Sequence, residues 1–310
     1  MRQTSRNDTE RRPSGAAQRG TETGNDQNNK HIMKKILTLI ACVAVLVSCG
    51  TAQQPTPIKV ISYNIRMSAA PDADGDNRWE NRKQASINMI NDQQPTLLGL
   101  QEACPDQVAF LDENLPDYKR IGVGREDGKA EGEMMAIYYR DADFELEKSG
   151  TFWLSETPDQ VSMGWDAACK RTCTWVLLRS KADGRRVGYM NTHLDHMGPT
   201  ARKESIKLIV AKIAELFDKE IPLFLTADFN SPDDDPIFDP LKAVMTEARS
   251  AAPESDNRAT FNDWGRSNDA VIDHIFLRGA KPLTFKVLCD ENYGAPYISD
   301  HYPVVLTAEY

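Results

Sequence analysis

Six short polar segments, each placed where an apolar run ends, constrain the fold of this chain more than any other feature. They are spread over most of the chain, so they do not form one local motif. In a β-strand, successive side chains point to opposite faces, and a polar residue at the strand end stands at the rim of the packed sheet. Several strands must therefore end near one another. The segments are Ser62-Tyr63-Asn64, Leu100-Gln101-Glu102, Asn191-Thr192-His193-Leu194-Asp195-His196, Ala227-Asp228-Phe229-Asn230, Ile272-Asp273-His274 and Ser299-Asp300-His301.

Short apolar strands alternate with helical stretches from residue 58 onward, and this alternation predicts an α/β fold. Several strands are nearly continuous in apolar residues, as expected when both faces of a sheet are covered. Two packed sheets with helices outside fit the number of elements. The expected strands are 58–65, 96–101, 134–139, 144–154, 174–178, 187–194, 223–227, 271–277, 283–288 and 304–308, and the expected helices are 81–92, 106–114, 200–217 and 237–244.

The first 57 residues differ in character from the rest of the chain. Residues 1–32 are polar and lack apolar periodicity, so we expect an extension that is disordered or not native, with Met33 as the true start. Two lysines then precede an apolar run over 36–47, which is too short to span a bilayer. This pattern is typical of a signal peptide, here over 33–48.

Leu46-Val47-Ser48-Cys49 resembles a bacterial lipobox, which predicts that Cys49 is lipidated and that residues 49–57 form a tether. A buried core helix is the alternative, but the polar sequence after Cys49 favours a tether. The expectation is an exported, membrane-anchored lipoprotein that faces the periplasm or the cell surface. A single domain over 58–310 follows, and a monomer is expected.

Acidic residues outnumber basic ones, 46 against 37, which gives a formal net charge of −9. The excess of acid is larger still without residues 1–48. Tight, non-specific binding to nucleic acid depends on clustered Lys and Arg, so nucleic acid is a possible partner but not a favoured one. A small phosphoester remains compatible with this balance, because a bound cation can supply local positive charge.

Four cysteines follow the expected lipidation site: Cys104, Cys169, Cys173 and Cys289. An exported protein can form disulfides, but four cysteines allow three pairings, and the sequence does not choose among them. Cys169 and Cys173 lack a second close pair or histidines at zinc spacing, so a zinc site is a weak interpretation.

Strand alternation places polar side chains in pairs on one side of a strand. Asp228 and Asn230 share a side, as do Asn191 and His193. Each pair alone is weak support for a site, because Asp and Asn at a strand end usually start a turn. The order and number of the segments carry more information than any one of them.

In that order, the six segments resemble the motifs of the endonuclease/exonuclease/phosphatase superfamily, which includes pancreatic-type deoxyribonuclease. The match covers residues 58 to 310, and its Asp-x-Asn and Ser-Asp-His pieces are the most specific. The chain looks similar to bacterial lipoprotein members of this group. The resemblance implies a four-layered α/β sandwich, with two packed mixed β-sheets flanked by helices and a site at one edge.

The resemblance also implies a metal site. Glu102 would be the principal ligand of Mg²⁺, helped by Asn64 and Asp300, since hard oxygen ligands suit this ion. Mn²⁺ or Ca²⁺ are possible substitutes. Asp228 would orient or deprotonate the attacking water, and Asn230 would hold a phosphoryl oxygen.

Two histidines have implied roles as well. His301 would contact the phosphoryl group, with Asp273 holding its other ring nitrogen and so fixing the tautomer. His193 would be the second histidine of the site, and Glu133 matches the acid that pairs with it. His196 falls where some relatives place a phosphate-contacting residue.

The substrate is less constrained. Arg171 is a candidate phosphate clamp, because a guanidinium binds two oxygens at once. Trp153 and Trp165 are candidates for stacking on a sugar or headgroup, with packing in core or loop as the alternative.

The expected function is that of a Mg²⁺-dependent phosphodiesterase or phosphatase acting on a small sugar- or lipid-linked phosphoester. The reaction would be an in-line attack by a water that the metal and Asp228 activate. An exported nuclease that cleaves DNA or RNA is the first alternative, and a non-catalytic binding lipoprotein is the second.

Overall fold

The computed structural model describes residues 56–310. The predicted polar extension, the signal peptide, Cys49 and most of the tether lie outside the described residues. Within 56–310, none of the helices combines the length and the apolar character needed to cross a membrane.

One sheet has seven strands in the order β10-β12-β13-β1-β2-β4-β3. Its central strand β1 runs parallel to β2 and antiparallel to β13. The strands are β1 (Pro57–Asn64), β2 (Leu97–Gln101), β3 (Tyr118–Ile121), β4 (Ile137–Arg140), β10 (Glu254–Ser255), β12 (Lys281–Val287) and β13 (Val304–Glu309).

The second sheet has six strands in the order β5-β6-β7-β8-β11-β9. Here β7 and β8 are parallel, and β8 pairs with β11 in antiparallel register. The strands are β5 (Phe144–Trp153), β6 (Thr172–Ser180), β7 (Arg186–His193), β8 (Leu223–Asp228), β9 (Thr246–Glu247) and β11 (Asp273–Arg278).

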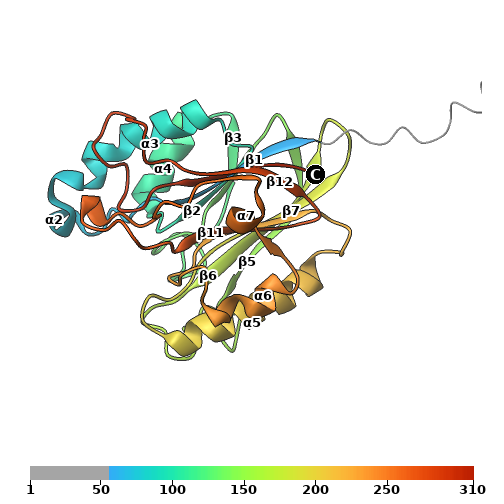
Figure 1. Cartoon of the computed structure of the whole chain (residues 1–310). Helices are drawn as coiled ribbons and strands as arrows, with labels where there is room; N and C mark the ends of the chain where they lie inside the picture. Colours follow the sequence, from blue (N-terminus) through green and yellow to red (C-terminus); the bar gives the residue numbers. More distant parts are fainter. Residues whose placement is uncertain (1–55) are drawn as a thin grey trace, which may run out of the picture. The chain divides into compact units, whose positions relative to one another are not determined.

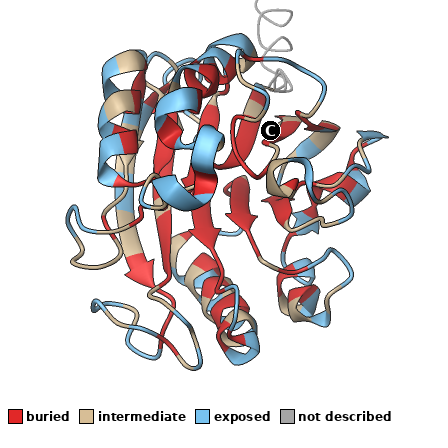
Figure 2. Ribbon diagram, turned by 90° about the vertical axis from the view of Figure 1, so that its left-hand side faces the viewer, coloured by how far each residue is buried: buried red, intermediate tan, exposed pale blue. Residues whose placement is uncertain are grey.

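Helices cover the outer faces of both sheets (Figure 1). Figure 2 shows the buried strands between helices whose outward faces are exposed. The helices are α2 (Pro71–Asp74), α3 (Trp79–Gln93), α4 (Pro105–Asn114), α5 (Pro199–Leu216), α6 (Asp239–Lys242) and α7 (Ala248–Ala251), with short 3₁₀ turns at Gly75–Asn77, Pro236–Phe238 and Asp263–Gly265.

Three clusters of buried apolar side chains pack between these layers. Val60, Phe224 and Leu306 belong to the cluster between the two sheets. A second cluster joins the outer face of the seven-stranded sheet to α3 and α4, and a third joins the six-stranded sheet to α5 and α6. The predicted four-layered α/β sandwich is therefore confirmed.

A buried polar layer between the sheets fixes their spacing near one edge. Gln101 donates to the side chains of Ser62 (3.1 Å) and Asn191 (2.7 Å), which joins the two sheets. Gly99 lies in this layer, and a Cβ there would come within 2.5 Å of the Tyr189 hydroxyl. Only glycine permits this close approach of the sheets.

Strand direction brings the six polar segments to one edge. The carboxyl ends of the parallel pair β1 and β2 lie together, as do those of β7 and β8. Because β11 is antiparallel to β8, its first residue Asp273 pairs with Asp228, the last residue of β8. The segment that precedes β13 carries Asp300 and His301 to the same edge.

The structure departs from the sequence-based elements in a few places. Strands β3, β9 and β10 were not predicted, and the helix expected over 237–244 is a 3₁₀ turn followed by the four-residue α6. Cys104, Cys169, Cys173 and Cys289 are all free thiols in the described part of the chain.

Candidate active site

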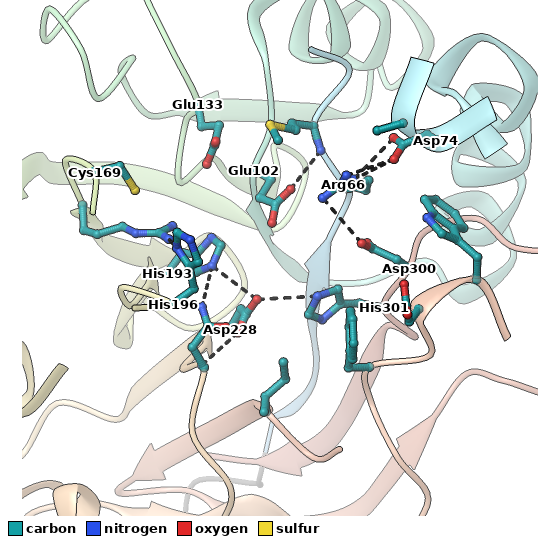
Figure 3. Close-up of a pocket in the computed structure, with 18 of the residues that line it drawn as sticks. Arg66, Asp74, Glu102, Glu133, Cys169, His193, His196, Asp228, Asp300 and His301 are labelled. Atoms are coloured by element: carbon teal, nitrogen blue, oxygen red, sulfur yellow. Dashed lines mark hydrogen bonds and ion pairs between the residues drawn. The ribbon is translucent and has the colours of Figure 1, made fainter. Parts of the chain in front are cut away.

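A pocket of about 640 Å³ opens at the edge where the strand ends converge. Figure 3 shows acidic and basic side chains from distant segments pointing into it. Asn64 and Asp273 stand behind this lining and hold it through hydrogen bonds. The predicted residues that line the pocket are Glu102, Glu133, Arg171, His193, His196, Asp228, Asn230, Asp300 and His301.

Three of the strand ends leave the sheet through left-handed backbone. Arg66 (φ 57°), Glu102 (φ 62°) and Asn230 (φ 51°) have positive φ although none is glycine. Such residues are strained and persist only where the surrounding structure holds them, which happens most often at functional sites. Each turn directs a polar side chain into the pocket instead of continuing the strand.

Asp228 lies at the centre of the site and is buried. Asn64 Nδ2 donates to Asp228 Oδ2 (2.9 Å), and the backbone N–H of Asn230 donates to Asp228 Oδ1 (2.9 Å). Burial raises the pKa of Asp228 to about 7, with the nearby Asp273 carboxylate adding to the rise and the charge of His301 opposing it. This carboxyl group therefore exchanges a proton near neutral pH.

His301 is held by a carboxylate on each side. Its Nδ1 lies 2.8 Å from Asp273 Oδ2, and its Nε2 lies 3.7 Å from Asp228 Oδ2. Burial lowers the pKa of His301, but the charges of Asp273 and Asp228 outweigh it and raise the value to about 10. The imidazole is therefore a buried cation at neutral pH.

His193 lies on the other side of Asp228. Its Nε2 is 2.9 Å from Asn230 Nδ2 and 3.3 Å from Asp228 Oδ2. Burial lowers the pKa of His193 well below its usual range, and the nearby Arg171 lowers it further. This imidazole is neutral, so the two histidines of the site differ in charge.

Glu133 has a different partner from the one that the resemblance implied. Its Oε2 accepts from Arg125 Nη1 at 2.6 Å, and His193 Nδ1 has no hydrogen-bond partner among the described residues. Burial raises the pKa of Glu133, and the charge of Glu102 contributes. The pairing of Glu133 with His193 is thus replaced by an ion pair that brings Arg125 into the pocket.

The donor set around Glu102 fits a hard divalent cation. Asn64 Nδ2 and the backbone N–H of Met67 each donate to Glu102 at 3.0 Å, and these bonds, together with the charges of His301 and Arg66, outweigh burial and lower the pKa of Glu102. The buried Asp300 lies close enough that the charge of Glu102 adds to burial in raising the pKa of Asp300. A cation bound between these two carboxylates would relieve their mutual repulsion.

Asn64 has its amide oxygen directed away from this pair. Asn64 Oδ1 accepts from the backbone N–H of Arg66 at 3.0 Å, so its nitrogen faces Glu102 and Asp228. In this arrangement Asn64 positions two carboxylates. Its role as a metal ligand stays a prediction.

A basic wall stands opposite, formed by Arg171, Arg125 and His196. Arg171 is almost fully buried, and its Nε lies 3.4 Å from Asp195 Oδ2 while its Nη2 lies 3.1 Å from His196 Nδ1. Because both sides of the guanidinium are already held, little side-chain entropy would be lost when it binds an anion.

The two predicted tryptophans do not line the pocket. Trp153 is buried, and its indole N–H donates to the carbonyl of Arg125 at 2.9 Å, so it holds the loop that carries Arg125. Trp165 is partly exposed on the following loop. The aromatic residues that do line the pocket are Trp264 and Phe261.

Sequence reasoning missed Arg66, Asp74, Arg125 and Trp264 as pocket residues. Arg66 Nη2 pairs with Asp74 Oδ1 at 2.9 Å, and Arg66 Nη1 lies 3.7 Å from Asp300 Oδ2. The sequence feature that could have indicated two of these residues is the length of the polar connections 122–132 and 250–268, because long connections in a compact domain are often functional. Arg125 and Trp264 both lie on them.

Comparison with known proteins agrees with this geometry. A protein of Acanthamoeba polyphaga mimivirus is 25% identical over 277 residues, which is 81% of this chain and 100% of that protein. The crystal structure of an endonuclease/exonuclease/phosphatase from Bacteroides vulgatus is 35% identical, with a TM-score of 0.77, and covers 82% of this chain and 98% of that one. A mannosyl-6-phosphatase of Bacteroides thetaiotaomicron is 34% identical, with a TM-score of 0.75, and covers 81% and 99%.

Residues 61–301 match the Endonuclease/Exonuclease/phosphatase family, and this range contains all six polar segments, from Ser62 to His301. Members of the family are hydrolases that act on phosphoester bonds. The fold, the order of the strand ends and the match over most of the described domain lead to one conclusion: the chain belongs to the endonuclease/exonuclease/phosphatase family.

Proposed function

We propose that this phosphoesterase is a Mg²⁺-dependent phosphatase that hydrolyses a small, sugar-linked phosphomonoester. The observation that carries the proposal is the buried row Asp273–His301–Asp228, in which a cationic imidazole lies beside a carboxyl group with a pKa near 7. The pocket has the volume of a small-molecule site. The 34% identity to a mannosyl-6-phosphatase supports a sugar phosphate.

Asp228 is the group that orients the attacking water and accepts its proton. A general base works best when its pKa lies near the working pH, and the pKa of Asp228 is about 7. Asn64 and the backbone of Asn230 fix the direction of its two oxygens. Asp228 lines the pocket, where the attacking water would reach its carboxyl group.

His301 and Arg171 stabilise negative charge on the phosphoryl oxygens. Phosphoryl transfer needs little covalent help from the protein, so positioning and charge stabilisation provide most of the acceleration. His301 is charged because of Asp273, and Arg171 is fixed by Asp195. Neither group has to reorganise when the reaction begins.

Glu102 and Asp300 would hold the cation. A bound Mg²⁺ neutralises charge on phosphoryl oxygens and on the leaving oxygen. The acidic balance of the chain, 46 acidic against 37 basic residues, favours this arrangement over a nucleic-acid substrate, because affinity for a long polyanion depends on clustered Lys and Arg.

A substrate panel tests the proposal. Mannose 6-phosphate, glucose 6-phosphate, bis-p-nitrophenyl phosphate, plasmid DNA and sphingomyelin are each incubated with Mg²⁺ and with EDTA, and released phosphate or cleaved product is measured. We expect release of phosphate from a hexose phosphate with Mg²⁺ only. Turnover confined to DNA or to the diesters would reject the phosphatase in favour of a nuclease or diesterase.

We also propose that the protein is exported and anchored through a lipid on Cys49, and that it acts as a monomer. The charged, apolar and small-residue pattern over 33–48 supports export. Incorporation of labelled palmitate into the wild type but not into Cys49→Ser tests the anchor. Equal labelling of the two proteins would exclude it.

A further inference from the structure

Trp264 lines the pocket in an unusual backbone conformation. Asp263 (φ 45°) and Trp264 (φ 57°) are consecutive residues with left-handed φ, and neither is glycine. Side chains rarely tolerate this conformation, so two in a row require a structural reason. Its effect is to present the indole of Trp264 at the pocket wall, close to Asp74, Arg66 and the rest of the site.

The turn is tied directly to the catalytic segment. Asn262 is completely buried, and its side-chain oxygen accepts from the backbone N–H of Trp264 at 2.9 Å. Its Nδ2 donates to the carbonyl of Ser299 at 3.2 Å, and the N–H groups of Asn262 and Asp263 donate to the carbonyl of Asp300. The backbone of the turn that carries Trp264 is therefore fixed relative to Asp300 and its neighbour His301.

The guanidinium of Arg82 supports the indole of Trp264 from inside the protein. Arg82 Cζ lies 5.6 Å from the centroid of the Trp264 ring and 5.2 Å from that of Trp79. Arg82 donates to the carbonyls of Ile65 and Arg66, so it cannot swing aside. A cation on one side of an aromatic ring holds the ring in place and leaves the remaining surface for another contact.

Polar groups border this ring. Arg266 Nη2 pairs with Asp263 Oδ1 at 2.6 Å, and Arg266 is largely exposed while Asp263 is partly exposed. On the far side, Asp74 pairs with Arg66. Hydroxyl groups bind well to carboxylate oxygens and guanidinium N–H groups, and the C–H face of a sugar ring packs on an aromatic ring.

We propose that Trp264 is the platform on which the pyranose ring of the substrate stacks, with Asp263 and Arg266 as hydroxyl partners. The inference rests on the proposed function and deepens it, because it specifies a cyclic sugar on the leaving-group side of the phosphorus. Trp264 is thus a specificity-determining residue, whereas Asp228 and His301 act on the phosphoryl group whatever the leaving group is.

The test compares a cyclic with an acyclic phosphomonoester. kcat and KM are measured with Mg²⁺ for mannose 6-phosphate, glucose 6-phosphate and glycerol 2-phosphate, in the wild type, Trp264→Ala and Trp264→Phe. Trp175→Ala is the matched control, because Trp175 is partly exposed and packs against Phe217 away from the pocket. Circular dichroism and melting temperature establish that each variant is folded.

Trp264→Ala should raise KM for the preferred hexose phosphate by roughly 10- to 100-fold with little change in kcat, since stacking is made equally in the ground and transition states. Glycerol 2-phosphate should respond by less than a factor of about three. Trp264→Phe should recover most of the loss, and Trp175→Ala should behave as the wild type.

Equal effects of Trp264→Ala on cyclic and acyclic esters, or no effect on either, would overturn the platform and leave the phosphatase intact. The platform is equally excluded if the wild type hydrolyses glycerol 2-phosphate but no hexose phosphate. A wild type that hydrolyses no phosphomonoester at all overturns the proposed function and the platform together. A crystal structure of Asp228→Asn with the hexose phosphate should place the sugar ring against the indole.

Discussion

Asn64 shows how one uncharged residue organises a site made of charges. Its amide nitrogen lies within 3.0 Å of Glu102 Oε1 and 2.9 Å of Asp228 Oδ2, so it separates two carboxylates that would otherwise repel each other. The Asn64 bonds lower the pKa of both carboxyl groups, but burial and the charge of Asp273 still raise that of Asp228, so the two groups differ. Glu102 has its pKa lowered and stays anionic, whereas Asp228 has its pKa raised to about 7 and can take up a proton.

Asp228→Asn should retain the fold and lose almost all activity. The amide keeps the shape of the carboxyl group but cannot accept a proton, so we expect kcat to fall by roughly 100- to 10,000-fold. Steady-state hydrolysis of the best hexose phosphate measures the effect. Asp159→Asn, which changes an exposed acid, is the control, and activity of Asp228→Asn near that of this control would remove Asp228 from the mechanism.

Asp195 gives a pH-dependent contribution to stability. Burial raises its pKa, but the backbone N–H groups of Gly198, Ala168 and Met197 outweigh burial and lower the pKa to about 2. A depressed carboxyl pKa adds stability that is complete above the unfolded value and is lost as pH falls through the folded one. The free energy of unfolding should therefore lose roughly 2 kcal/mol from this group between pH 5 and pH 2.

Urea unfolding of the wild type and Asp195→Asn at several pH values checks this. The variant should be less stable by roughly 2 kcal/mol at pH 7, and the gap should narrow steadily as pH falls below 4. A gap that stays constant with pH would mean that the Asp195 carboxylate is not the titrating group.

At the scale of elements, the sequence predicted the long apolar strands and missed the short or interrupted ones. The ten expected strands are present with ends shifted by at most a few residues, because continuous apolar runs define them well. β3 was missed since Lys119 and Arg120 interrupt its apolar character. β9 and β10 have two residues each, too few for any pattern.

The site shows a similar contrast, between residues beside strands, which were predicted, and residues on loops, which were missed. Asp228 and Glu102 were predicted because each stands at the end of an apolar strand, and His301 because it stands just before one, where sequence pattern is informative. Arg125 and Trp264 come from long loops, whose paths depend on tertiary hydrogen bonds such as that from Asn262 Nδ2 to the carbonyl of Ser299. No local sequence pattern encodes such a path. The error on the partner of Glu133 has the same origin, because Arg125 reaches it through a loop.

Arg82 connects the helix α3 with the ends of two other elements. It donates to the carbonyls of Ile65 and Arg66 after β1 and to that of Ile298, three residues before His301. Arg82→Met would leave these buried carbonyls unpaired, and we expect a loss of roughly 3 kcal/mol in the free energy of unfolding. Urea denaturation measures it, with Lys83→Met on the same helix as the control.

Hydrogen exchange adds a local check on Arg82. The amides of residues 64–67 and 298–301 should lose protection in Arg82→Met before the rest of the sandwich does. Unchanged protection in these two segments would show that other contacts hold the strand ends.

For the molecule as a whole, cation binding should be visible in stability as well as in activity. At a Mg²⁺ concentration about 100 times the Kd, the folded state gains about 2.7 kcal/mol, which raises the melting temperature by roughly 5 °C or more. Glu102→Gln should abolish this shift, whereas Glu131→Gln, at an exposed loop acid, should keep it. A wild type whose melting temperature is the same with Mg²⁺ and with EDTA would contradict a resident cation.

Both ends of the folded domain lie away from the pocket. Thr56 and Tyr310 exchange backbone hydrogen bonds at the start of β1, while Asn64 at the other end of that strand reaches the site. Figure 1 shows the C-terminus at the opposite end of the domain from α2. The eight residues of β1 separate the start of the domain from Asn64 at the site, a distance of roughly 26 Å along the strand. A domain attached near either of its ends to a bead, a chip or a cell envelope therefore leaves its pocket accessible to substrate in solution.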